Sequence, residues 1–137
     1  MATILLIDDD ASNREPTGRL LRHEGYEVVR AANGRDALEL LSAYPVDLIL
    51  LDLVMPEMDG LTFLKLLRGN PRHKHLPVVM LTALSDGEPL HRSQRLGVNE
   101  YLVKSRFSPE RLLEVVRGQL LAPVTSQPTA APATPAA

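Results

Sequence analysis

Five polar residues stand where apolar runs of this sequence end, and together they suit phosphoryl chemistry. Asp8 and Asp9 follow the first run, and Asp52, Thr82 and Lys104 each close a later one. If the runs are neighbouring parallel strands, their carboxyl ends meet at one edge of a sheet. Three carboxylates, a hydroxyl and an ammonium would then share one crevice, which suits a divalent cation and a phosphoryl group.

Each of these groups has a predicted role. Carboxylate oxygens are the hard ligands that Mg²⁺ prefers, so Asp9 and Asp52 are the predicted ligands, with Asp8 binding directly or through water. Asp52 is the predicted nucleophile and would form an aspartyl phosphate. Thr82 and Lys104 would hold the phosphoryl oxygens as negative charge spreads over them.

A simpler interpretation exists for each residue taken alone. An aspartate after a strand is most often a helix cap or a turn residue, and we expect Asp10 or Ser12 to cap the first helix. A lysine at a strand end is usually solvated. The joint pattern favours a site, because adjacent carboxylates repel one another unless a cation lies between them.

Apolar runs alternate with amphipathic stretches along the chain, which predicts alternating strands and helices. Strands one, three and four are apolar almost throughout, as in a parallel sheet covered on both faces. The pattern predicts a doubly wound α/β fold with helices on both faces of a five-stranded sheet in the flavodoxin-like order 2-1-3-4-5. We expect strands at 3–7, 26–32, 46–51, 78–81 and 101–103 and helices at 12–24, after Asn33, after Asp59, at about 86–96 and from Pro109, with Ser108 as its cap. Pro16 predicts a late start or a kink in the first helix.

Composition limits the classes of protein. The chain has 137 residues, a net charge of -2 and no cysteine, so we expect neither nucleic acid nor membrane binding. Without a signal sequence or an apolar run of about 20 residues, a cytoplasmic location is the expectation. Residues 1–121 are predicted to form one domain, and residues 122–137, rich in proline and alanine, a disordered tail or linker.

Four stretches surround these polar residues. They are Ile4-Leu5-Leu6-Ile7-Asp8-Asp9-Asp10, Leu51-Asp52-Leu53-Val54-Met55-Pro56-Glu57-Met58-Asp59-Gly60, Val79-Met80-Leu81-Thr82-Ala83 and Tyr101-Leu102-Val103-Lys104. With these stretches the sequence resembles the receiver domain of two-component response regulators, over about residues 3–121. The stretch that ends in Met-Asp-Gly is highly specific in combination with the other three.

The resemblance implies a function for each matching position. Asp52 would be the phosphoacceptor, and the backbone carbonyl of Val54 would join Asp8, Asp9 and Asp52 in holding Mg²⁺. The phosphoryl donor would be a phosphohistidine on a sensor histidine kinase or a histidine phosphotransfer protein. Such a domain is no enzyme in the usual sense, since it catalyses only its own phosphorylation and dephosphorylation.

The resemblance also implies a switch and a partner surface. Thr82 would bind the phosphoryl group together with Lys104 and report phosphorylation to the switch residue Tyr101. The face of the fourth helix, fifth strand and last helix, with Arg92, Arg95 and Arg106, would then meet a downstream protein, an output domain or a second copy of the chain.

One position departs from the family pattern, and two other functions stay open. Ser105 follows Lys104, where the family usually has proline after a cis bond, so the resemblance leaves the position of the Lys104 ammonium open. One alternative is a receiver-like scaffold that phosphorylation does not regulate. The other is a haloacid dehalogenase-like phosphatase with Asp8-Asp9-Asp10-Ala11-Ser12 as nucleophile motif, although it would leave Asp52 unexplained.

Overall fold

A parallel sheet forms the centre of the molecule, and we describe it from a computed structural model that covers residues 2–53, 55, 58–83, 87–104, 106 and 108–121. Within these residues the sheet has five strands in the order β2-β1-β3-β4-β5, all parallel. The strands are β1 (Thr3–Ile7), β2 (Glu27–Ala31), β3 (Leu48–Asp52), β4 (Val78–Thr82) and β5 (Glu100–Val103). The predicted doubly wound α/β fold and its strand order are confirmed.

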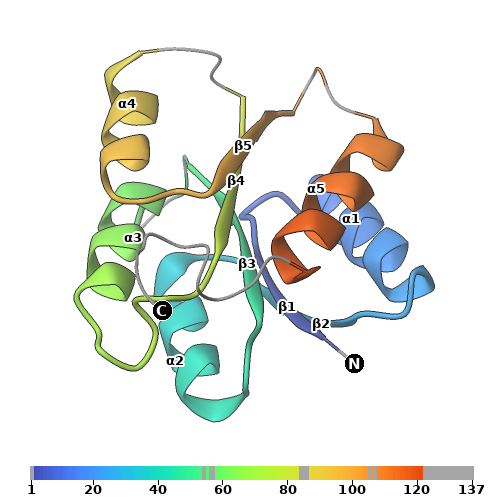
Figure 1. Ribbon diagram of the computed structural model, residues 1–137, viewed down its shortest axis with the longest axis horizontal. Coiled ribbons are helices and arrows are strands. Elements are labelled where there is room, and N and C mark those ends of the chain that lie inside the picture. Colours follow the sequence, from blue (N-terminus) through green and yellow to red (C-terminus); the bar gives the residue numbers. More distant parts are fainter. Residues whose placement is uncertain are drawn as a thin grey trace.

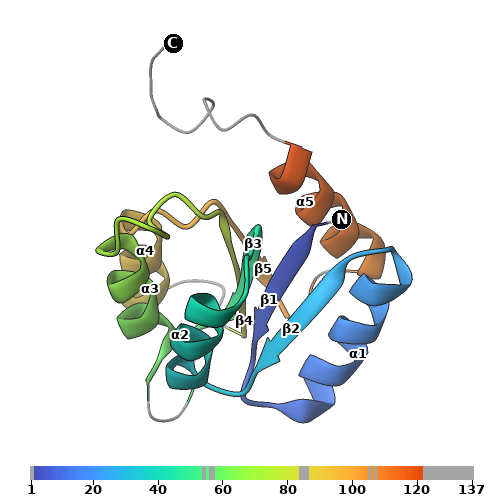
Figure 2. The same ribbon diagram turned by 90° about the horizontal axis from the view of Figure 1, so that it is seen from below.

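Helices cover both faces of the sheet, as Figures 1 and 2 show. They are α1 (Ala11–His23), α2 (Gly34–Ala43), α3 (Gly60–Arg68), α4 (Glu88–Arg95) and α5 (Pro109–Leu121). In Figure 2, α1 and α5 lie on one face, and α2, α3 and α4 lie on the other. The chain changes face where the strand order reverses between β1 and β3, and ligands of such sheets bind at this point.

Two hydrophobic clusters, one on each face of the sheet, form the core. In β1, Ile4 and Leu6 belong to the cluster that includes α1 and α5, whereas Leu5 and Ile7 belong to the cluster that includes α2 and α3. Every residue of β1, β3 and β4 is buried, and β2 at the edge is partly exposed. These strands are therefore apolar throughout because both of their faces meet helices.

Polar caps fix where the helices begin. Asp10, Asn33 and Asp59 each accept a backbone N–H of the first turn that follows, and Ser108 does the same for α5. The cap at Asp10 starts α1 at Ala11, more than one turn before Pro16, so a late start of this helix is wrong. Pro16 instead lies inside α1, where it has no N–H to donate to the preceding turn.

The sequence predicts a tail or linker after residue 121. Residues 122–137 lie outside the described residues, so the division of the chain at residue 121 stays a prediction. Among the described helices, none combines the length and the apolar character needed to cross a bilayer.

Candidate functional site

The strand register brings the predicted site residues to one edge of the sheet. Ile7 of β1 is paired with Leu51 of β3, so Asp8, one residue further on, is level with Asp52. On the other side of β3, Thr82 ends β4 and pairs with Val103, and Lys104 follows directly. The carboxyl ends of β1, β3, β4 and β5 therefore place these residues at one edge of the sheet, as the sequence predicts.

Three carboxylates gather at this edge. Asp8, Asp9 and Asp52 each place one oxygen so that the three oxygens lie within 4.8 Å of one another. Asp8 is 2% exposed and Asp52 is 5% exposed, whereas Asp9 lies at the surface. Burying two carboxylates side by side is costly unless cations compensate their charge, and the oxygen donors suit Mg²⁺ in both kind and number.

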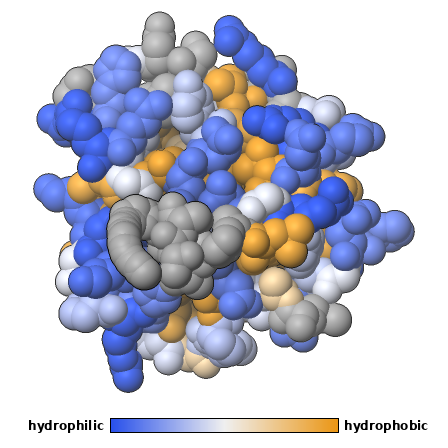
Figure 3. Space-filling model, in the orientation of Figure 1, coloured by the Kyte–Doolittle hydropathy of each residue, from blue (hydrophilic) through white to orange (hydrophobic). Residues whose placement is uncertain are grey.

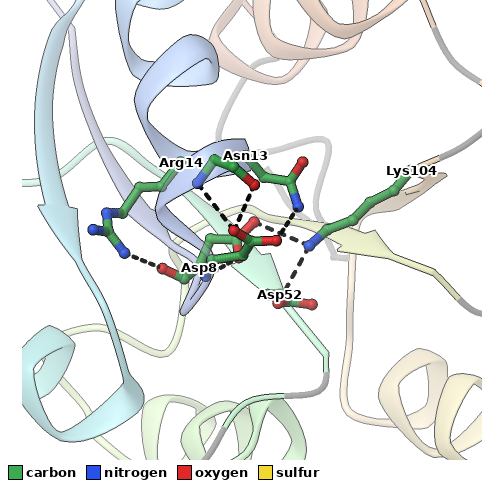
Figure 4. A network of polar contacts seen from close by, with 7 residues as sticks. Asp8, Asn13, Arg14, Asp52 and Lys104 are labelled. Carbon is green, nitrogen blue, oxygen red and sulfur yellow. Dashed lines mark hydrogen bonds and ion pairs between the residues drawn. The ribbon is translucent and has the colours of Figure 1, made fainter.

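The side chain of Lys104 supplies one compensating charge. Its ammonium lies 3.0 Å from Oδ2 of Asp8 and 3.3 Å from Oδ2 of Asp52 (Figure 4). Burial alone would lower the pKa of Lys104, but the hydrogen bond to Asp8 and the charges of Asp52 and Asp8 outweigh it, so the pKa lies above the usual lysine value. Ser105 lies outside the described residues, and the Lys104 ammonium nevertheless reaches the carboxylate cluster.

Backbone contacts hold Asp8 in place. Its Oδ1 accepts the N–H of Asp10 at 2.9 Å, and its own N–H donates to the carbonyl of Ala31 at 3.1 Å. Its carbonyl accepts a hydrogen bond of 2.7 Å from Arg14, a residue of α1 that Figure 4 shows beside the site. The sequence did not single out Arg14. The available signal was a cationic residue one turn into the helix that follows the aspartates. Such a residue does not by itself show that its side chain donates to a backbone carbonyl.

Asp10 belongs to the helix and not to the carboxylate cluster. Its Oδ1 accepts both the N–H and the hydroxyl of Ser12, at 2.9 Å and 2.6 Å. The side-chain and backbone hydrogen bonds from Ser12 hold the pKa of Asp10 below its usual value. The predicted choice of Asp10 or Ser12 as cap is therefore decided for Asp10, and the three adjacent aspartates divide into two members of the carboxylate cluster and one helix cap.

A glycine allows the chain after Asp52 to turn tightly against the strand. The N–H of Gly60 donates to the carbonyl of Leu53 at 2.9 Å. A Cβ at Gly60 would lie 2.6 Å from the carbonyl oxygen of Asp52 and 2.9 Å from Cα of Leu53. Only glycine fits this approach, which gives a physical reason for the Asp59-Gly60 pair. Val54, the predicted carbonyl ligand of Mg²⁺, lies outside the described residues.

The two predicted switch residues lie on the same face of the sheet. Thr82 is fully buried, and its carbonyl accepts the N–H of Lys104 at 2.7 Å. Tyr101 is partly buried, pairs with Met80 and packs against the cluster that Met80 joins. Because residues two apart on a strand share a face, Thr82 lies diagonally across from Tyr101 on that face.

The comparison with known proteins identifies the family. Residues 4–117 match the response regulator receiver domain. The chain belongs to this family. The match excludes the haloacid dehalogenase-like alternative for this region, since receiver domains are signalling domains and not enzymes in the usual sense.

Individual receiver domains of known structure are similar to this chain in both sequence and fold. The Vibrio cholerae chemotaxis protein CheY4 is 37% identical, with a TM-score of 0.80 over 85% of this chain and 97% of CheY4. The signal receiver domain of a histidine kinase from Syntrophus aciditrophicus is 33% identical, with a TM-score of 0.81 over 88% of this chain and 90% of that domain.

The curated relatives that match by sequence are longer than this chain. The DNA-binding response regulator MtrA of Mycobacterium tuberculosis is 36% identical over 85% of this chain, which covers 50% of MtrA. The chain spans half or less of the length of the first curated relatives it matches. Because one of these relatives is named as DNA-binding, the expectation that this protein binds no nucleic acid stays a prediction.

Proposed function

We propose that this receiver domain takes a phosphoryl group onto Asp52 from a phosphohistidine of a sensor histidine kinase or a histidine phosphotransfer protein. The observation that carries the proposal is the carboxylate cluster itself, with three aspartate oxygens within 4.8 Å and the Lys104 ammonium 3.3 Å from Asp52. A carboxylate oxygen of Asp52 would attack the phosphorus atom, and the bond from phosphorus to the histidine nitrogen would break.

Each neighbouring group has a part in this transfer. Mg²⁺ held by Asp8, Asp9, Asp52 and the Val54 carbonyl would offset the repulsion between a carboxylate and an anionic phosphoryl group. The Lys104 ammonium, already beside Asp52, would bind a phosphoryl oxygen as charge develops on it.

Thr82 would transmit the effect of phosphorylation from the site to the partner surface. Its hydroxyl would move toward the phosphoryl group, and Tyr101, on the same face of the sheet, would turn inward as space opens. This movement would change the face made by α4, β5 and α5, and a downstream protein, an output domain or a second copy would bind there. A receiver-like scaffold without phosphorylation remains the competing function, and the close placement of Asp52 and Lys104 favours phosphorylation over it.

Intact mass measurement tests the proposal. The chain is incubated with Mg²⁺ and acetyl phosphate, and we expect the mass of one phosphoryl group to be added. Asp52→Asn should abolish the addition, whereas Asp59→Asn should retain it, because Asp59 is an exposed cap of α3. Absence of any added mass in the wild type, or its persistence in Asp52→Asn, would contradict the proposal. Omission of Mg²⁺ should also prevent the addition.

A further inference from the structure

Arg14 of α1 lies beside the carboxylate cluster and contacts its backbone (Figure 4). Much of the surface seen in Figure 3 is hydrophilic, and charged side chains on such a surface are ordinarily solvated. Arg14 differs, because its side chain is only 17% exposed. Its Nη1 donates to the carbonyl oxygen of Asp8 at 2.7 Å. An arginine placed in this way can act on the site without binding a metal ion or a phosphoryl group itself.

A second contact fixes the guanidinium of Arg14 from the side of the edge strand. Its Nε lies 3.6 Å from Oε2 of Glu15, and Oε1 of Glu15 pairs with Nη1 of Arg30 in β2. The Glu15 carboxylate therefore offsets part of the charge of Arg14 and also ties α1 to β2. The position of the Arg14 guanidinium is thus set by contacts with the end of β1, with its own helix and, through Glu15, with β2.

Asp9 is the member of the carboxylate cluster that has the least support of its own. Asp8 is buried, its N–H donates to Ala31, and its Oδ1 accepts the N–H of Asp10. Asp9 lies at the surface, and within the part of the chain that the structure describes its carboxylate has no hydrogen bond or ion pair. One of its oxygens nevertheless lies within 4.8 Å of oxygens of Asp8 and Asp52. The backbone that leads into Asp9 therefore determines where this oxygen lies.

The carbonyl group that Arg14 holds belongs to the peptide between Asp8 and Asp9. The carbonyl of Asp8 and the N–H and Cα of Asp9 lie in one rigid plane. A rotation about ψ of Asp8 would therefore move this carbonyl oxygen and the Cα of Asp9 together. The hydrogen bond of 2.7 Å from Arg14 restricts that rotation, and with it the placement of the Asp9 carboxylate.

We propose that Arg14 is a positioning residue, which fixes the peptide between Asp8 and Asp9 and so presents the Asp9 carboxylate to Mg²⁺. The inference rests on the metal site of the proposed function, and it adds to that site a residue that touches neither the metal ion nor the phosphoryl group. Groups that orient a metal ligand affect the affinity for the metal although they do not bind it.

Positioning and charge repulsion predict opposite effects of removing Arg14. A cation close to the carboxylates repels Mg²⁺, so repulsion alone predicts tighter Mg²⁺ binding when Arg14 is replaced by a neutral residue. Loss of positioning predicts weaker binding, because the Asp9 carboxylate is no longer held toward the cluster. We expect weaker binding, since Glu15 already offsets part of the Arg14 charge.

Isothermal titration calorimetry of the intact chain with Mg²⁺ alone measures this effect. Arg14→Met should weaken Mg²⁺ binding about tenfold. Arg14→Lys, which keeps the charge and a donor, should recover part of the affinity. Arg19→Met removes an exposed arginine of the same helix and should change the affinity less than about twofold. Circular dichroism establishes that each variant is folded at the titration temperature, and Arg14→Lys carries the comparison with wild type if Arg14→Met does not fold.

A double-mutant cycle shows whether Arg14 acts through Asp9. In the Asp9→Asn background the carboxylate that Arg14 positions is gone, so Arg14→Met should change Mg²⁺ affinity less than about twofold there. An equal loss of affinity in both backgrounds would show that Arg14 supports the site in another way, and it would overturn the proposal.

Nitrogen-15 relaxation of the metal-free chain gives a second measurement, which does not need Mg²⁺. Arg14→Met should lower the order parameter of the Asp9 amide from about 0.85 toward about 0.6, and Arg19→Met should leave it unchanged. A wild type that binds no Mg²⁺ would overturn both the proposed metal site and this inference. If the wild type binds Mg²⁺, then unchanged or tighter binding by Arg14→Met, or an unchanged order parameter of Asp9, would overturn this inference alone.

Discussion

The ammonium of Lys104 lies 3.0 Å from Oδ2 of Asp8, although the two residues are 96 positions apart in the chain. The same ammonium lies 3.3 Å from Oδ2 of Asp52. Lys104 therefore stands among the carboxylates that we propose as metal ligands, and it must affect metal binding and phosphoryl transfer in opposite directions. A nearby positive charge repels Mg²⁺, whereas it stabilises a developing phosphoryl anion.

Lys104→Met should separate these two effects. Removing the ammonium should raise the affinity for Mg²⁺ about fivefold to tenfold, since unit charges about 4 Å apart in water-like surroundings repel by about 1 kcal/mol, and a divalent ion by more. Phosphorylation by acetyl phosphate should nevertheless slow by at least about tenfold, because a phosphoryl oxygen loses its cation. Isothermal titration calorimetry and intact mass measure the two quantities.

Asp9→Asn is the matched control for Lys104→Met. It removes one anionic ligand from the cluster and should weaken Mg²⁺ binding while leaving the Lys104 contacts in place. If Lys104→Met weakened Mg²⁺ binding as well, the ammonium would be ordering the carboxylates and not competing with the metal.

The raised pKa of Lys104 predicts how this contact depends on pH. Because the pKa is higher in the folded chain than in the unfolded chain, the charge of Lys104 stabilises the fold fully below the ordinary lysine value of 10.5 and loses this contribution as pH rises through the raised value. Without Mg²⁺, Lys104→Met should be less stable than wild type by about 1–3 kcal/mol at neutral pH. The difference in free energy of unfolding between the two proteins should stay constant up to about pH 10 and narrow above it. Urea unfolding of both proteins across this range tests the trend, with exposed Lys65→Met as control.

The sequence was sufficient to predict this edge of the sheet because its determinants are local. Apolar runs mark β1, β3 and β4, and parallel strands bring their carboxyl ends together whatever the details of packing. Asp8, Asp52, Thr82 and Lys104 could thus be placed from the runs that they follow. The caps at Asn33, Asp59 and Ser108 were equally local.

Contacts that depend on tertiary packing could not be predicted. Arg14 and Arg68 donate to backbone carbonyls, which every residue carries, so no pattern of side chains identifies these partners. Arg92 and Arg95 were expected on the face shared by the fourth helix, fifth strand and last helix, and that role stays a prediction. The sequence did not show that they also lie beside Leu61 and Lys65 of α3.

Arg68 is predicted to contribute more to stability than any exposed cation of α3. Its guanidinium donates to four carbonyls, and burial holds its pKa below the usual arginine value, so the charge is stabilised mainly by those hydrogen bonds. Arg68→Met would leave four carbonyls without this donor, those of Leu76 and Leu96 in part-buried surroundings, and should lower the free energy of unfolding by about 2–4 kcal/mol. Lys65→Met, on the exposed side of the same helix, should change it by less than about 0.5 kcal/mol. Equal effects of the two substitutions would show that the four hydrogen bonds are not strong determinants of the fold.

Two glycine-to-alanine substitutions should act in opposite directions. At Gly60 a new Cβ would meet the carbonyl oxygen of Asp52 at 2.6 Å, and backbone atoms cannot move aside as a flexible side chain can. Gly60→Ala should therefore lower the free energy of unfolding by about 1–3 kcal/mol and weaken Mg²⁺ binding, because the displaced strand end carries Asp52. Gly118, inside α5, has nothing within 4 Å of its Cβ position, so Gly118→Ala should stabilise by about 0.5–1 kcal/mol. Urea unfolding gives the two stabilities and calorimetry gives the Mg²⁺ affinities. Unchanged Mg²⁺ binding in a destabilised Gly60→Ala would show that the turn supports the fold without positioning Asp52, whereas Gly118→Ala should leave the metal affinity as in wild type.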